Sequence, residues 1–294
     1  MKFFAGILVL LMLSTSCEKT LDLRPQSLDA VLVVDGTIES GQPPIIVLSK
    51  SLNYFSAINS EILSASQVHN AVLILTDGTK THRLKEYTRQ LGGGYSISYY
   101  STDSSDLSTA ITGEFGKKYD LTIDVAGRQY TSTTSIPLLN KKLDSLWWKP
   151  APGNDDTSKV ILMTKTVDPK GFGDYIRYFT RVNDGEFLPG ATSVFDDQIV
   201  EGTAYEIQVD QGINRNAPPE DKDYGFFEKG DTATVKFCNI DKATFDFWRT
   251  LEYSYQSIGN PFSTPTTILT NIKGGALGAF CGYAVQYKTL IIPK

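Results

Sequence analysis

The sequence predicts a mainly β protein, with an N-terminal immunoglobulin-like β-sandwich followed by a second β-rich domain that carries one amphipathic helix. Short alternating runs recur along the chain with turn residues between them, and one stretch has apolar residues at helical spacing. The composition agrees, because 15 Tyr, 15 Phe and 24 Gly are typical of strands joined by tight turns.

Residues 1–16 have the pattern of a cleaved export signal. Lys2 is followed by an apolar run over residues 3–13, which as a helix would span only about 16 Å, too short for a membrane core of about 30 Å. Small residues then precede Cys17, as in bacterial lipoprotein precursors. Ser14 stands where that cleavage site usually has Leu, so an ordinary signal before an incidental cysteine is the alternative. We expect Cys17 to be lipidated and to anchor the chain in a membrane.

A polar tether and the first domain follow the signal. Residues 17–29 contain Pro25 and predict a flexible tether. Residues 30–138 predict the immunoglobulin-like sandwich, because about seven short strands separated by turns are typical of that fold. These runs begin at Val31, Ile45, Ala71, Thr79, Tyr95, Tyr119 and Gln129. Asp77-Gly78 predicts a hairpin, since this dipeptide accepts the positive φ of a type I′ turn.

Residues 139–294 predict the second β-rich domain. Its strand-like runs are Leu143–Lys149, Val160–Val167, Tyr175–Val182, Ala204–Val209, Thr232–Ile240 and Tyr283–Ile291. A helix is expected near residues 241–258, where Asp241 caps the first turn and Gly259 and Pro261 end the last one. Apolar residues recur there every three or four positions, so one side of the helix should pack on a sheet.

Charge and hydropathy narrow the choice of partners. The formal net charge is −5, and Lys and Arg do not cluster, which argues against nucleic acid. Beyond the N-terminal run no apolar stretch approaches 18 residues, so the lipid anchor is the only expected membrane contact.

Cys238 and Cys281 are the remaining cysteines. An exported chain meets an oxidising compartment, so a disulfide between them is one expectation and two free thiols are the other. Strand alternation places Cys238 on the opposite face from Val235 and Phe237.

The motifs of common catalytic sites are missing from the sequence. His69 and His82 are the two histidines, and neither belongs to a metalloprotease, serine-hydrolase or phosphate-loop motif. We expect both imidazoles at strand surfaces, and we expect no catalytic residue, no cofactor and no metal site. Asp196, Asp197 and Glu201 form an acidic loop, interpreted first as solvated, then as a calcium site or a catalytic group.

Trp147 and Trp148 are the most conspicuous pair of aromatic residues. In a strand, adjacent side chains point to opposite faces. Packing is the first interpretation for both rings, and contact with a ligand or a partner protein is the alternative.

Short motifs are spread along the mature chain. They are Val33-Val34-Asp35-Gly36, Gly41-Gln42-Pro43-Pro44, Asp168-Pro169-Lys170-Gly171, Gly230-Asp231 and Asn260-Pro261-Phe262-Ser263. With these motifs the chain resembles a family of Bacteroidota lipoproteins catalogued as a domain of unknown function. The resemblance implies an outer-membrane lipoprotein, often encoded beside TonB-dependent receptors, and it implies no catalytic residues.

The anchor and the resemblance together lead to a functional expectation. We expect a non-enzymatic accessory or binding subunit of a TonB-dependent transport system, anchored in the outer membrane at the cell surface or the periplasmic face. One alternative is a glycan- or peptide-binding module for nutrient capture, which an exposed aromatic residue such as Trp147, Trp148 or Tyr224 would favour. A hydrolase is the third reading and would need convergent acids in a cleft. None of these readings names a ligand.

Overall fold

The structure is a computed structural model, and it describes residues 30–52, 59–92, 95–167, 171, 173–196, 202–214, 224–258, 260, 263–264 and 266–294. The expected signal peptide, the acylation site at Cys17 and the tether therefore lie outside the described residues. Asp197 and Glu201 of the acidic loop also lie outside them, as do Gly259 and Pro261.

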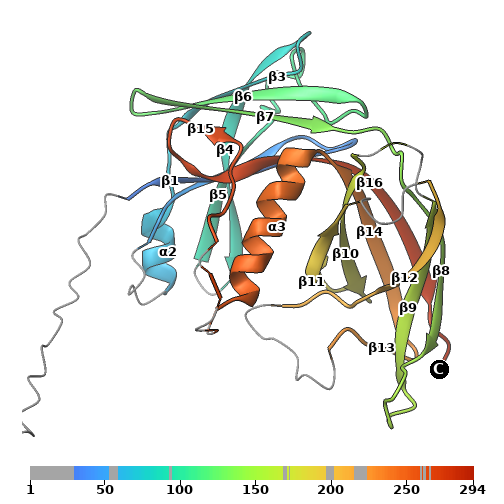
Figure 1. The fold of residues 1–294 in the computed structure, drawn as a ribbon. Coiled ribbons are helices and arrows are strands. Elements are labelled where there is room, and N and C mark those ends of the chain that lie inside the picture. The colour runs from blue at the N-terminus through green and yellow to red at the C-terminus, as the bar shows by residue number, and fades with distance from the viewer. Residues whose placement is uncertain are drawn as a thin grey trace, which may run out of the picture.

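The chain is mainly β, as the sequence predicts (Figure 1). The first strands are β1 (Leu32–Glu39), β2 (Ile45–Lys50), β3 (Val72–Thr76), β4 (Thr81–Gly92), β5 (Tyr95–Ser101), β6 (Lys117–Val125) and β7 (Arg128–Ile136). The later strands are β8 (Lys142–Pro150), β9 (Lys159–Val167), β10 (Tyr175–Val182), β11 (Leu188–Phe195), β12 (Ala204–Val209), β13 (Phe227–Glu228), β14 (Thr232–Ile240), β15 (Ile272–Lys273) and β16 (Leu277–Ile291). The helices are α2 (Ser60–Ser66) and α3 (Lys242–Gln256).

Two sheets contain these strands. The larger has 12 strands in the order β11-β10-β14-β16-β1-β2-β5-β4-β3-β6-β7-β15. The smaller has 4 strands, with β12, β9 and β13 in order and β8 also paired with β9. The hairpin predicted at Asp77-Gly78 is confirmed, because it joins the antiparallel strands β3 and β4 and Gly78 has a φ of 85°.

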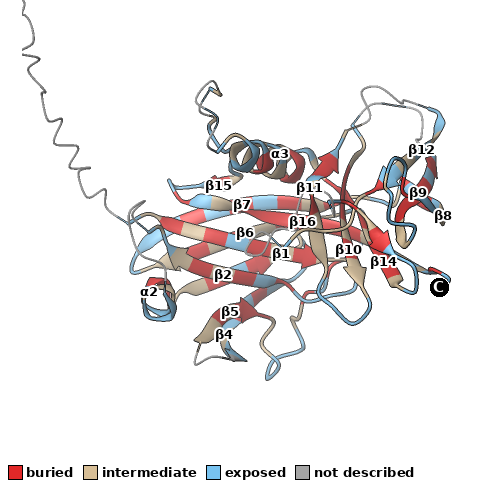
Figure 2. Cartoon of the chain, turned by 90° about the horizontal axis from the view of Figure 1, so that it is seen from below, coloured by how far each residue is buried: buried red, intermediate tan, exposed pale blue. Residues whose placement is uncertain are grey.

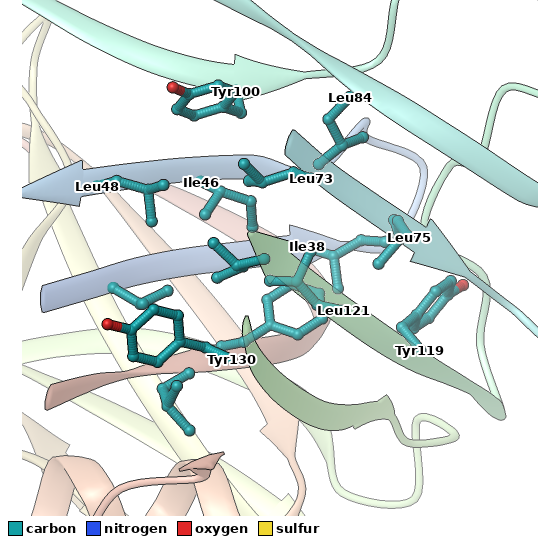
Figure 3. Close-up of a cluster of buried hydrophobic side chains, with 14 of the residues drawn as sticks. Ile38, Ile46, Leu48, Leu73, Leu75, Leu84, Tyr100, Tyr119, Leu121 and Tyr130 are labelled. Carbon is teal, nitrogen blue, oxygen red and sulfur yellow. The ribbon is translucent and has the colours of Figure 1, made fainter. Parts of the chain in front are cut away.

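The first core lies inside the sandwich formed by β1 to β7, where the larger sheet folds over itself. Alternate residues of each strand point inward, among them Ile46 and Leu48 of β2 and Leu73 and Leu75 of β3, and Figure 3 shows Ile46 beside Leu73. Each of these four side chains is at most 1% exposed. Burying them supplies the main stabilisation of this region, at roughly 25 cal/mol per Å² of apolar surface.

The second region has three layers. The smaller sheet covers one face of β10, β14 and β16 around a second core, and α3 covers the opposite face around a third. Ala233, Val235 and Phe237 point into the second core, whereas Cys238 lies in the third, as strand alternation predicted. Figure 2 shows buried residues along β1 and β16 and on one side of α3.

The expected division into residues 30–138 and 139–294 needs one correction. β16 pairs in parallel with β1 and antiparallel with β14, so one backbone ladder joins the two ranges. Phe280 and Ala284 of β16 belong to the first core, so the last strand completes the sandwich of the first range. The pairing was missed because a parallel partner can lie far along the chain, where local patterns carry no signal.

The two helices differ in how well the sequence predicted them. The helix expected near residues 241–258 is confirmed as α3, and the Asp241 carboxylate accepts a hydrogen bond from the Thr244 amide at 2.8 Å. Its second oxygen accepts one from the Ser135 amide of β7 at 2.8 Å, which ties the helix to the sandwich. α2 was not predicted, because a single short helix capped by Asn59 leaves little periodic pattern.

The expected disulfide is absent, since Cys238 and Cys281 are both free and buried. Cys238 lies opposite Val285 in the ladder between β14 and β16. Cys281 precedes Val285 by four residues, or roughly 13 Å along a strand, whereas a disulfide needs Cα atoms within about 7 Å. Burial raises the pKa of each thiol to about 12, so neither is poised to react.

Candidate functional site

A pocket of about 500 Å³ lies between α3 and the larger sheet. Its floor comes from β1, β10, β14 and β16, and its roof comes from α3, from Pro189 of β11 and from Phe187, which precedes that strand. We call it the α3 pocket. Its volume is within the range of roughly 300–1,000 Å³ that is usual for small-ligand sites.

The alternation of β1 places polar residues on the pocket floor. Val34 and Ile38 point into the first core, so Asp35, Thr37 and Glu39 point to the opposite face, toward α3. The same strand therefore contributes to the sandwich core on one face and to the pocket on the other.

Arg177 is a charged residue fixed behind the pocket floor. Its side chain is 3% exposed, and its guanidinium carbon lies 3.3 Å from the centre of the Trp248 ring and 4.6 Å from that of Phe179. Nε donates a hydrogen bond to Ser193 Oγ at 3.2 Å, and Nη1 donates one to the Tyr283 hydroxyl at 3.0 Å. Trp248 Nε1 donates to the same hydroxyl at 2.9 Å, so α3, β10 and β16 are tied together.

Glu252 of α3 completes this buried network. Its carboxylate accepts hydrogen bonds from the Ser193 hydroxyl at 2.5 Å and from the Ser193 amide at 2.9 Å. Ser193 thus links the carboxylate of Glu252 to the guanidinium of Arg177. Because these groups are buried and bonded to one another, they fix the roof of the pocket to its floor.

Asp35 differs from the other charged groups of the pocket in having no hydrogen-bond partner for its side chain among the described residues. Its side chain is exposed on the pocket floor, and no described residue donates a hydrogen bond to its carboxylate. The surrounding walls displace part of the water near this carboxylate, which raises the pKa of Asp35, and the charge of Arg177 lowers it by less. The carboxylate is therefore reached by water but incompletely stabilised by the protein.

Glu39 and Lys236 form an ion pair at the other end of the floor, at 2.5 Å. Lys236 also lies 5.2 Å from the centre of the Phe179 ring. Beyond this pair the α3 pocket continues into a hollow of about 340 Å³, which shares Thr37 and Glu39 with it. Ile45 and Tyr287 supply apolar surface to this extension.

The tryptophan pair lies away from the α3 pocket. Trp147 and Trp148 are on β8 in the smaller sheet, and both are half-buried. Trp148 packs against the second core, and Lys149 Nζ lies 5.7 Å from the centre of the Trp147 ring. Neither ring lines the α3 pocket, and neither does the exposed Tyr224.

His82 lines a second, more polar hollow of about 650 Å³ on the sandwich, which we call the β4 hollow. His82 was expected at the surface, and this was wrong. It is 2% exposed, accepts a hydrogen bond from the Asp103 amide and bonds to Thr109 Oγ1. His69 is exposed, as expected, and lies 2.6 Å from Glu86.

Within the described part of the chain, no cluster of three or more His, Cys, Asp or Glu side chains is arranged to hold a metal ion. Neither described helix has the length and apolar character needed to cross a membrane. In comparisons with known proteins, a family model described as "Domain of unknown function (DUF4249)" matches residues 18–289. No curated protein matches the chain.

Proposed function

The chain belongs to the family described as a domain of unknown function (DUF4249), and we propose that it is a lipoprotein anchored in the outer membrane that serves as a non-enzymatic binding subunit of a TonB-dependent transport system. The observation that carries the binding role is the α3 pocket, whose roof and floor are joined by buried hydrogen bonds and whose floor holds the open carboxylate of Asp35.

The arrangement of the polar groups favours binding over hydrolysis. Ser193 and Glu252 form the closest hydroxyl–carboxylate pair beside the pocket, but they are 0% and 3% exposed. A substrate cannot reach a hydroxyl in that position, and a nucleophile must contact the reacting atom. The pair therefore supports the pocket wall, which is what a binding protein requires.

The anchor supports the choice of a membrane partner. A tether of residues 17–29, held by acylated Cys17, extends at most about 45 Å. The folded body would then stay near the membrane surface, where confinement raises the effective concentration of an embedded receptor. The resemblance to lipoproteins encoded beside TonB-dependent receptors supports a barrel of that class.

The alternative is a glycan- or peptide-binding module that captures nutrients without a receptor. Phe187 and Tyr255 line the pocket, and their aromatic rings offer a stacking surface for a sugar or a peptide side chain, which favours this alternative. The two proposals differ in whether a barrel accompanies the protein.

Affinity purification from native membranes tests the proposal. A tag placed after Lys294, followed by gentle detergent extraction, should recover the protein with a TonB-dependent barrel and with acyl chains on Cys17 by mass spectrometry. The matched control is Cys17→Ala, which should lose both the acyl chains and the barrel. Repeated recovery without a barrel, together with saturable binding of a sugar or peptide, would favour the alternative.

A further inference from the structure

The ligand class of the α3 pocket is open to inference, and this step rests on the proposed binding function. Four charged residues line the pocket: Asp35, Glu39, Arg177 and Lys236. Three of them are already engaged, because Glu39 pairs with Lys236 at 2.5 Å and Arg177 bonds to polar groups of β11 and β16. Among the described residues, none donates a hydrogen bond to Asp35, so its carboxylate is the charge that a ligand would meet.

The surroundings of Asp35 favour a positively charged group. The walls raise its pKa and the single opposing influence is Arg177, so its negative charge is only partly compensated. An ammonium group placed there would supply both a positive charge and N–H donors, which makes a charge-assisted hydrogen bond. An anionic group would instead meet the carboxylates of Asp35 and Glu39, while Arg177 is 3% exposed and stacked on Trp248.

The remaining walls favour an apolar body on that ligand. The pocket is also lined by Phe187, Pro189, Leu251 and Tyr255. The extension past Glu39 adds Ile45 and Tyr287, of which Ile45 is 47% and Tyr287 58% exposed. Such surfaces gain free energy when an aromatic or aliphatic group covers them.

We propose that the α3 pocket binds a ligand that carries a primary ammonium group on an aromatic or apolar body, with the ammonium at Asp35 and the body against Leu251, Tyr255 and Phe187. This chemistry has two sources, the amino terminus of a peptide and a small aromatic amine. A peptide would extend along β1 into the hollow beside Tyr287, whereas a small amine would fill the α3 pocket alone.

Calorimetric titration of the full-length acylated protein in mild detergent tests the proposal. The probes are phenethylamine and the tripeptide amide Phe-Ala-Ala-NH₂, each compared with its N-acetylated form, which keeps the body and loses the charge. We expect each amine to bind at least tenfold more tightly than its acetylated partner. The tripeptide will bind more tightly than phenethylamine if a peptide is the source, and phenethylamine will bind at least as tightly if a small amine is.

Two variants assign the binding to Asp35. Asp35→Asn keeps the shape of the side chain and should weaken both amines at least tenfold while leaving the acetylated probes unchanged. Asp155→Asn is the matched control, because Asp155 is an exposed carboxylate in the loop before β9, and it should leave all affinities within twofold. Equal binding of amine and acetylated probes, no effect of Asp35→Asn, or no saturable binding of either amine would overturn the proposal. None of these results bears on recovery of a barrel, which tests the proposed function separately.

Discussion

The β4 hollow and the α3 pocket hold carboxylates in opposite states. In the β4 hollow, burial alone would raise the pKa of Glu86. Hydrogen bonds from the Asn70 amide, His69 and Tyr100 together lower the pKa by more than burial raises it, so the net shift is downward. In the α3 pocket, no described residue donates a hydrogen bond to Asp35, and its pKa is raised. A carboxylate stabilised by its own chain serves the fold, whereas one left open is available to a ligand.

The buried network of Arg177, Ser193 and Glu252 behind the α3 pocket is satisfied by its own chain, like Glu86 in the β4 hollow. Breaking this network should have the largest effect on the free energy of unfolding. Arg177→Ala leaves Glu252 and Ser193 buried without their cation, and we expect a loss of about 3–5 kcal/mol in the free energy of unfolding. Urea denaturation followed by circular dichroism measures this. Arg89→Ala, at an exposed position of β4, is the control and should cost less than about 0.5 kcal/mol. Equal effects of the two variants would show that the network does not hold α3 to the sheet.

Glu86→Gln tests the satisfied carboxylate, with the next largest effect. We expect a loss of about 1–3 kcal/mol at neutral pH, because donors aimed at a carboxylate lose their charged acceptor. Because the pKa of Glu86 is lowered in the folded state, the ionised carboxylate stabilises the fold at pH values above its pKa in the unfolded chain, about 4.3. The contribution disappears as the pH falls through the folded pKa, so variant and parent should converge in acid. A Glu86→Gln variant as stable as the parent at neutral pH would contradict the assignment.

Asp35→Asn should have the smallest effect on stability, and of opposite sign. The raised pKa means that the folded state binds this proton more readily than the unfolded state, so ionised Asp35 destabilises the fold as the pH rises. Replacing it should increase the free energy of unfolding only slightly at neutral pH, because solvent screens this exposed carboxylate, with no gain below its unfolded pKa of about 3.9. The measurement is urea denaturation at several pH values. A loss of stability at neutral pH would mean that Asp35 has a structural role.

Local patterns in the sequence predicted the features of the fold that depend only on residues close together in the chain. The hairpin at Asp77-Gly78 and the cap at Asp241 follow from a few adjacent residues, and the opposite faces of Val235 and Cys238 follow from the period of a strand.

The site itself depends on residues that are distant in sequence, so local patterns did not reveal it. The α3 pocket forms because β16 pairs with β1, which brings Tyr283 beside Glu39 and under Trp248. Two signals were present: Arg177 interrupts a largely apolar strand, and Glu252 follows Trp248 by one helical turn. Both suggest a buried polar network, but neither names its partners.

The central claim is that Asp35, unlike Glu86, awaits a cationic partner, and a carbon-13 NMR titration of both carboxyl groups in one sample tests it most directly. Without ligand, we expect Asp35 to titrate above the usual Asp value of about 3.9 and Glu86 below the usual Glu value of about 4.3. Saturation with phenethylamine should lower the pKa of Asp35, because an adjacent ammonium stabilises the ionised carboxylate, and should leave that of Glu86 unchanged. An Asp35 midpoint at or below the usual value, or one that the amine does not move, would contradict the account.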